Sequence, residues 1–176
     1  MLLESGAEGE VRATSDDTKL AHFGPADPEP PSTGPLGPPR AEGHRVHVIG
    51  PRGRFESPAG RPYFRFYADS TEPTSRAFLL YSAREPGWSV DFHEHSTDEL
   101  VFLLTGSVRF GKRQRYAAGS CLALAAGQRY ALAAGPEGFT SINYRRDAST
   151  LRYPGRERSW LETGATAGGI PIIEQG

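Results

Sequence analysis

The stretch of residues 87–106, GWSVDFHEHSTDELVFLLTG, constrains the fold of this 176-residue chain more than any other. Residues 88–95 contain no Pro or Gly and are rich in β-forming residues, which predicts a strand. Residues 100–104 form a short apolar run of strand length. The polar turn at residues 96–97 predicts a hairpin, which would fold Glu99 back beside the first strand.

The first of these strands carries two histidines. Side chains alternate across a strand, so His93 and His95 are expected on the same face, with Glu99 beside them. Two imidazoles and one carboxylate are the ligand types and the number that a divalent metal needs. We therefore predict a metal site with open positions for water, O₂ or substrate. The alternative is a metal-free protein in which the three side chains form a hydrogen-bonded polar cluster.

A family resemblance rests on the same stretch. Its sequence fits Gly-x5-His-x-His-x3-Glu-x6-Gly, the first signature motif of the cupin family. The residues that match this motif position by position are Gly87, His93, His95, Glu99 and Gly106. The chain resembles the family over about residues 76–146. The resemblance implies an all-β fold, the cupin double-stranded β-helix or jelly-roll barrel.

The second cupin motif, Gly-x5-Pro-x-Gly-x2-His-x3-Asn, is matched only in part. Gly119 and Gly127 are kept, whereas Ala125 and Ala134 replace the Pro and the Asn. Tyr130 stands where the family has its third histidine ligand. The resemblance thus implies departures from the family pattern at the metal site itself.

Tyr130 has three possible roles. It could be a phenolate metal ligand, an acid/base group that donates to a bound substrate, or a wall residue of the barrel. A nearby cation would lower its pKa below the ordinary value for tyrosine. We predict the metal ligands His93, His95, Glu99 and Tyr130, and the catalytic residues Tyr130 and Glu99.

The function that the resemblance implies is broad, because cupins include dioxygenases, isomerases, epimerases, lyases, cyclases and proteins without catalysis. We favour a metal-dependent enzyme that acts on a small oxygenated organic substrate. Its ligand set resembles the facial triad of non-heme Fe(II) oxygenases, so Fe(II) is favoured over Zn, Ni or Mn. A zinc or nickel cyclase, isomerase or lyase of a biosynthetic pathway is one alternative. A non-catalytic ligand-binding or regulatory cupin is another, and the loss of the third histidine favours it.

Neighbours of the motif residues are expected to point elsewhere. By alternation, Trp88, Val90 and Phe92 should face away from the metal, into the layer between sheets or a dimer interface. Glu94 should also face away from the histidines. Asp98 is expected to be a solvated turn residue.

The rest of the chain shows many short segments of strand length and no convincing long helix, which favours a sandwich or barrel independently of the motif. Residues 128–133 and 139–145 are expected to be separate strands, joined by a turn at residues 135–138. The predicted organisation is a disordered Pro/Gly-rich arm at residues 1–42, a cupin barrel at 43–153 and a partly packed tail at 154–176.

The composition indicates which classes of partner to expect. The formal net charge of −1 gives no reason to expect binding to nucleic acid or to an anionic membrane surface. The single cysteine suits a reducing compartment, and the chain shows neither a secretory signal nor an apolar run of membrane-spanning length. We expect a cytoplasmic protein that binds a small-molecule substrate and forms a homodimer.

Overall fold

The computed structural model describes residues 2–3, 15–16, 46–47, 53–69, 77–156 and 159–171. The chain forms two compact units, residues 1–49 and 50–176. In the first unit, β1 (Leu2–Leu3) pairs antiparallel with β2 (Val46–His47). The predicted disordered arm lies almost entirely outside the described residues.

The second unit is built from strands, and no described residue is helical. Its strands are β3 (Phe55–Glu56), β4 (Phe64–Asp69), β5 (Phe78–Arg84), β6 (Ser89–His95), β7 (Glu99–Phe110), β8 (Gln114–Ala117), β9 (Cys121–Leu124), β10 (Tyr130–Arg145), β11 (Thr150–Arg152), β12 (Trp160–Leu161) and β13 (Ile170–Pro171). Within the described part of the chain, no helix could span a membrane.

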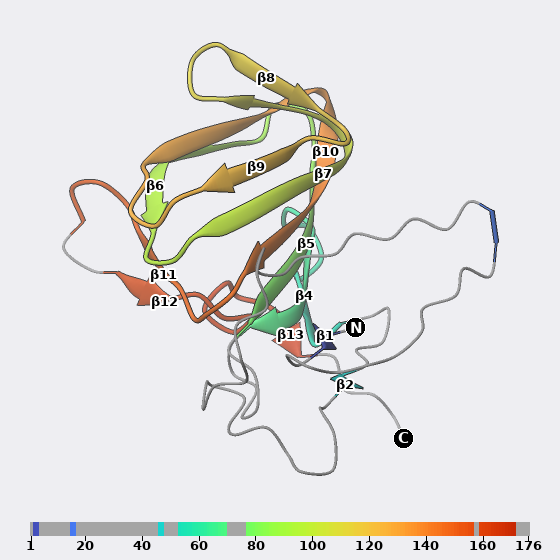
Figure 1. Ribbon diagram of the computed structural model, residues 1–176, viewed down its shortest axis with the longest axis vertical. Coiled ribbons are helices and arrows are strands. Elements are labelled where there is room, and N and C mark those ends of the chain that lie inside the picture. The colour runs from blue at the N-terminus through green and yellow to red at the C-terminus, as the bar shows by residue number, and fades with distance from the viewer. Residues whose placement is uncertain are drawn as a thin grey trace. The chain divides into compact units, whose positions relative to one another are not determined.

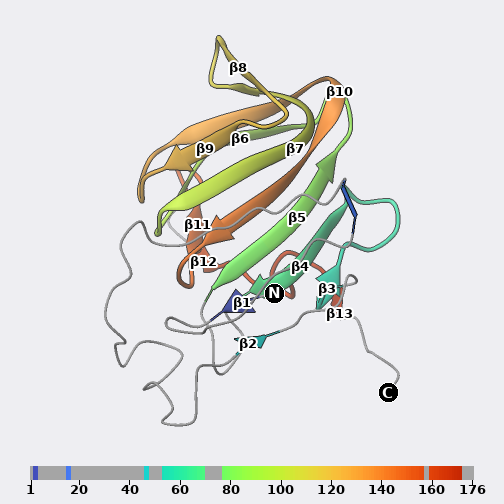
Figure 2. The same cartoon turned by 45° about the vertical axis from the view of Figure 1, so that its right-hand side comes forward.

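These strands form one curled antiparallel sheet. Its main path runs β12-β11-β6-β10-β5-β4-β3-β13, and β7 pairs off this path with β10, β8 and β9. Strands β6, β7, β9 and β10 curl around a common interior (Figures 1 and 2). The predicted all-β jelly-roll barrel is confirmed.

Strand β10 differs from the sequence prediction, because it is one strand of 16 residues rather than two strands joined by a turn. Its register against β7 shifts between Ala134 and Phe139, where the two strands approach closely. A Cβ atom on Gly106 would lie only 2.1 Å from the Gly138 carbonyl oxygen, so the close approach requires a glycine at position 106. As a result β10 supplies Tyr130 at its start and Arg145 at its end.

The predicted hairpin between β6 and β7 is wrong, because these two strands do not pair. One edge of β6 is occupied by β10, with Tyr130 opposite His93, and the other by β11, with Leu151 opposite His95. Residues 96–98 therefore carry the chain away from β6 to a strand that pairs with β8, β9 and β10.

Trp88 and Val90 do pack into the layer between sheets, as predicted, but the prediction that they face away from the histidines is wrong. Three steps of β6, from Val90 to His93, span only two steps of β10, from Leu132 to Tyr130. Such a β-bulge inserts an extra residue and reverses the alternation of side chains beyond it. Trp88 and Val90 consequently pack against the buried interior, whereas Phe92 is 53% exposed.

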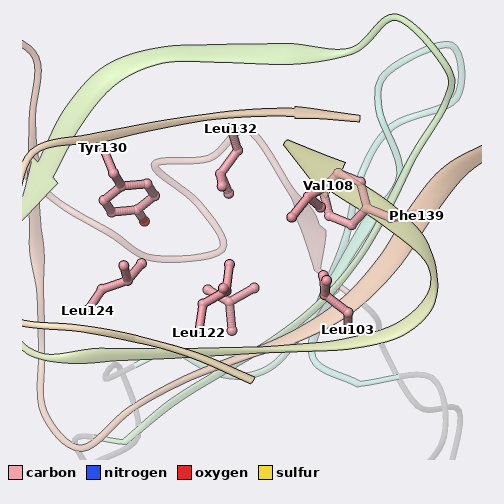
Figure 3. Close-up of a cluster of buried hydrophobic side chains, with 8 residues drawn as sticks. Leu103, Val108, Leu122, Leu124, Tyr130, Leu132 and Phe139 are labelled. Carbon is pink, nitrogen blue, oxygen red and sulfur yellow. The ribbon is translucent and has the colours of Figure 1, made fainter. Parts of the chain in front are cut away.

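The interior of the barrel contains a group of buried side chains, which we call the apolar cluster (Figure 3). Its members come from β7, β9 and β10. They are Val101, Leu103, Val108, Leu122, Leu124, Tyr130, Leu132 and Phe139. On β7, alternation puts Glu99, Val101 and Leu103 on this inner face, and only Glu99 is polar.

Candidate functional site

The structure brings the four predicted ligands together at one end of the barrel interior. His93 and His95 come from the end of β6, Glu99 from the start of β7 and Tyr130 from the start of β10. All four are buried. The His93 ring centroid lies 5.0 Å from that of His95 and 4.3 Å from that of Tyr130.

The Glu99 carboxylate is the centre of this group, and three side chains donate hydrogen bonds to it. Arg145 Nη2 and Asn143 Nδ2 donate to Oε1 over 2.7 and 3.0 Å, and the Tyr130 hydroxyl donates to Oε2. Burial alone would raise the pKa of Glu99, but the charge of Arg145 and these hydrogen bonds outweigh it and lower the pKa to about 2. Glu99 is therefore ionised near neutral pH.

Arg145 pairs with a second carboxylate, which the C-terminal part of the chain supplies. Arg145 Nη1 donates to Glu162 Oε2 over 2.7 Å, and the guanidinium lies 4.2 Å from the centroid of the Phe78 ring. Burial would lower the pKa of Arg145, but Glu99 and Glu162 outweigh it and raise the pKa. We call His95, Glu99, Asn143, Arg145 and Glu162 the polar cluster.

The protonation of His95 follows from its partners. Arg145 Nη2 lies 3.3 Å from His95 Nε2, and an arginine can only donate, so Nε2 must be the acceptor. His95 Nδ1 lies 2.8 Å from Glu162 Oε2 and therefore carries the proton. His95 is thus a neutral imidazole whose Nε2 lone pair is directed at the guanidinium.

His93 differs from His95 in having one free nitrogen. Its Nδ1 lies 2.8 Å from the Asp91 carbonyl oxygen, which can only accept, so Nδ1 carries a proton. Burial lowers the pKa of His93, which favours the neutral imidazole. Within the described residues nothing hydrogen-bonds to Nε2, so this nitrogen keeps an uncommitted lone pair.

Tyr130 is held as a neutral phenol. Burial, followed by the negative charge of Glu99, raises its pKa, and its hydroxyl proton is committed to Glu99. A phenolate ligand would first have to lose this proton. The roles of Tyr130 as metal ligand and acid/base group stay predictions.

The donor types at this site suit a divalent metal, but their arrangement does not. Among the described residues no three His, Cys, Asp or Glu side chains are placed to hold a metal ion. The reason is that Arg145 already occupies Glu99 Oε1 and His95 Nε2, while Tyr130 occupies Glu99 Oε2. The residues as placed therefore do not fit the metal that the cupin resemblance implies.

Arg145, Asn143 and Glu162 are site residues that were not predicted from the sequence. A signal for the first two was present, because Ser141, Asn143 and Arg145 alternate along β10 and so share a face. Three polar residues on the inner face of a barrel strand indicate a buried polar group. Glu162 follows the short strand β12 and carries no local signal of its role.

The neighbouring acidic residues lie outside the polar cluster. The Glu94 carboxylate accepts hydrogen bonds from Arg129 and Arg152, which lower its pKa. Asp98 is exposed, and its Oδ1 accepts a hydrogen bond from the Ala126 backbone N–H over 2.8 Å. Asp98 thus fastens its turn to the loop that leads into β10.

No family model matches the sequence, and no curated protein matches it. Solved structures do. An RmlC-like cupin protein from Ralstonia eutropha superposes with a TM-score of 0.55 at 14% identity, covering 70% of this chain and 83% of that one. A protein of unknown function with a cupin-like fold, from the same organism, gives 0.49 at 12% identity over 61% and 68%. Oxalate decarboxylase from Bacillus subtilis gives 0.43 at 19% identity over 50% and 26%. On the first of these similarities and on its own strand topology, the chain has the cupin fold.

Proposed function

We propose that this chain is a small-molecule-binding cupin that works without a metal, and that its ligand is held against His93. The observation that carries this proposal is the Nε2 atom of His93, to which no described residue donates a hydrogen bond and which lies next to aromatic rings. An acceptor that no protein group occupies is available to a hydroxyl or N–H of a ligand. The ligand class is therefore a small organic molecule with a hydrogen-bond donor.

An open pocket of about 680 Å³ supports this location. It is lined by residues 89–92 of β6 and by Tyr153, Pro154 and Arg156. His93 does not itself line this pocket, but two lining residues adjoin it: the Asp91 carbonyl oxygen accepts a hydrogen bond from His93 Nδ1, and the ring centroid of Tyr153 lies 5.9 Å from that of His93. The volume lies within the range of small-molecule sites. Phe92 and Tyr153 favour an apolar or aromatic body, and Arg156 favours a carboxylate on it.

Binding assays on metal-free protein test this proposal. Hydroxylated aromatic and aliphatic carboxylic acids would be titrated into the chelator-treated chain by calorimetry. We expect at least one compound to bind, with affinity reduced roughly tenfold or more in His93→Ala and in Arg156→Ala, as loss of a hydrogen bond or charged contact predicts. Arg113→Ala, on the exposed β7–β8 loop, is the matched control and should leave affinity unchanged. No binding, or equal binding by all variants, would refute the proposal.

A metal-dependent enzyme is the second candidate, leaning to an Fe(II)-type oxygenase over a zinc or nickel cyclase, isomerase or lyase. It is favoured by the presence of His93, His95 and Glu99 in one buried group, with His95 Nε2 only 3.6 Å from Glu99 Oε2. The test is elemental analysis of protein purified without chelator or metal-affinity resin. Near-stoichiometric iron with oxygen uptake would favour this candidate over the first.

A homodimer and a cytoplasmic location are also proposals. The exposed apolar side chains Phe92 and Leu104, 53% and 40% exposed, support the dimer because such groups gain from burial in an interface. Light scattering coupled to size-exclusion chromatography would check the mass.

A further inference from the structure

Arg145 contacts two of the three groups that would hold a metal. Its Nη2 lies 2.7 Å from Glu99 Oε1 and 3.3 Å from His95 Nε2. A divalent metal would need the lone pairs of these same two atoms. The guanidinium and a metal ion are therefore alternative occupants of one position.

The guanidinium is also fixed where it lies. Its side chain is 3% exposed, Nη1 is bound to Glu162 over 2.7 Å, and its face covers the Phe78 ring. Removing it from this position would leave two carboxylates without their cation and break a cation–π contact. A metal ion in solution competes with a cation that is covalently part of the chain.

Tyr130 occupies the remaining part of the Glu99 carboxylate. Its hydroxyl takes the second oxygen of Glu99, and as a neutral phenol it offers no basic lone pair to a metal. Its ring centroid lies 4.3 Å from that of His93 and 5.9 Å from that of His95. A histidine at position 130 would therefore place a third imidazole beside the other two.

We propose that the Arg145 guanidinium is the resident cation of this site and takes the place of a divalent metal. The histidine is still oriented as in a metal site. The Glu162 carboxylate accepts the His95 Nδ1 proton, as carboxylates do behind metal-binding histidines. Removal of the guanidinium together with an imidazole at position 130 should then restore metal binding.

Metal uptake by the full chain tests this inference with Co²⁺ and Zn²⁺ as probes. The wild-type chain should hold well under one equivalent after dialysis. Tyr130→His/Arg145→Leu should hold about one equivalent, as expected for a single site made of three imidazoles and the Glu99 carboxylate, and show the visible absorption bands of bound Co²⁺. Its thermal midpoint should rise on metal addition, because the metal neutralises Glu99 and Glu162.

Two controls make the result specific. Tyr130→His alone keeps the guanidinium and should take up no metal, and the double variant with an added His93→Ala should lose what it gained. About one equivalent bound by the wild-type chain would overturn the inference. So would a folded double variant that takes up none.

A folding failure is also decisive. If the leucine variant does not fold, Tyr130→His/Arg145→Gln keeps a hydrogen-bonding side chain and is scored in the same way. If neither variant recovers the β-sheet circular dichroism spectrum even with metal present, no metal can replace the guanidinium, and the inference is wrong. Metal uptake and binding of organic acids are separate measurements, so failure of one is distinguishable from failure of the other.

Discussion

Strands β7 and β10 each contribute to two regions of the barrel interior with different chemistry. Val101 and Leu103 of β7 belong to the apolar cluster, while Glu99, on the same face of the same strand, belongs to the polar cluster. On β10, Leu132 and Phe139 belong to the apolar cluster and Arg145 to the polar cluster. The backbone geometry is common to both regions, so the side chains make the difference.

The two regions are stabilised in different ways. The apolar cluster gains from removing hydrocarbon from water, a contribution that is roughly additive over area and needs no exact partner. In the polar cluster, each charge is tolerated only because a specific partner faces it. The loss of stability on substitution should therefore grow with the apolar area removed in the apolar cluster. In the polar cluster the full loss should appear as soon as one partner of a pair is removed.

The largest effect is expected from breaking the polar cluster at Arg145. Arg145→Leu leaves Glu99 and Glu162 without their cation, and loss of one partner of a buried pair costs roughly 3–5 kcal/mol. Urea unfolding followed by circular dichroism measures it. The control Arg152→Leu removes an ion pair to Glu94 from a side chain that is 50% exposed, and it should cost much less because solvent screens the pair. Equal costs would mean that burial of the Arg145 pair is unimportant.

Truncating a side chain in the apolar cluster should lower the free energy of unfolding by somewhat less. Leu103 is fully buried, and Leu103→Ala removes methyl groups and leaves a cavity, at a cost of about 3 kcal/mol. The next residue provides the control, because Leu104 is 40% exposed and Leu104→Ala should change the free energy of unfolding by about 0.5 kcal/mol. If the Leu104 variant were the less stable one, the assignment of the inner face of β7 would be wrong.

Lowering the pH should weaken the polar cluster and leave the apolar cluster unchanged, because only the polar cluster contains carboxylates. The pKa of Glu99 is about 2 in the folded chain and 4.5 without the fold, so the folded state favours the carboxylate. Its stabilisation is present above pH 4.5 and is lost as the pH falls toward about 2. The difference in unfolding free energy between wild type and Glu99→Gln should shrink over this range. Leu103→Ala removes a side chain that does not titrate, so its difference from wild type should not depend on pH.

The apolar region and the strand framework could be largely predicted from the sequence. Alternation along residues 99–103 and the Gly-punctuated segments indicate a β barrel because these signals are local. Two features escaped prediction. The bulge that turns Val90 inward and the pairing of β6 with β10 and β11 both depend on strands distant in sequence.

The polar cluster was predicted only in part, for the same reason. His93, His95 and Glu99 lie within seven residues, and their spacing indicates a shared site. Arg145 and Glu162 reach that site from 46 and 67 positions away from their partners Glu99 and His95. Spacing alone can suggest that two histidines and a carboxylate surround a cation. It cannot tell whether that cation is a metal or a distant arginine.

The smallest effect is expected at Tyr130, the residue in contact with both regions. Its ring stacks on Phe110 in the interior, with centroids 5.7 Å apart, while its hydroxyl donates to Glu99. Tyr130→Phe keeps the ring contacts and loses only the hydrogen bond to a charged group, so it should cost about 1.5 kcal/mol. The half-buried Tyr116 provides the control, because Tyr116→Phe should leave stability unchanged within about 0.5 kcal/mol.

The same substitution should raise the pKa of Glu99, because one donor to the carboxylate is gone. NMR titration of the Glu99 side-chain carboxyl in both proteins measures this shift directly. A stability loss with no change in that pKa would assign Tyr130 to the apolar cluster alone. A pKa change with no stability loss would make its hydroxyl an electrostatic partner of Glu99 that the fold can do without.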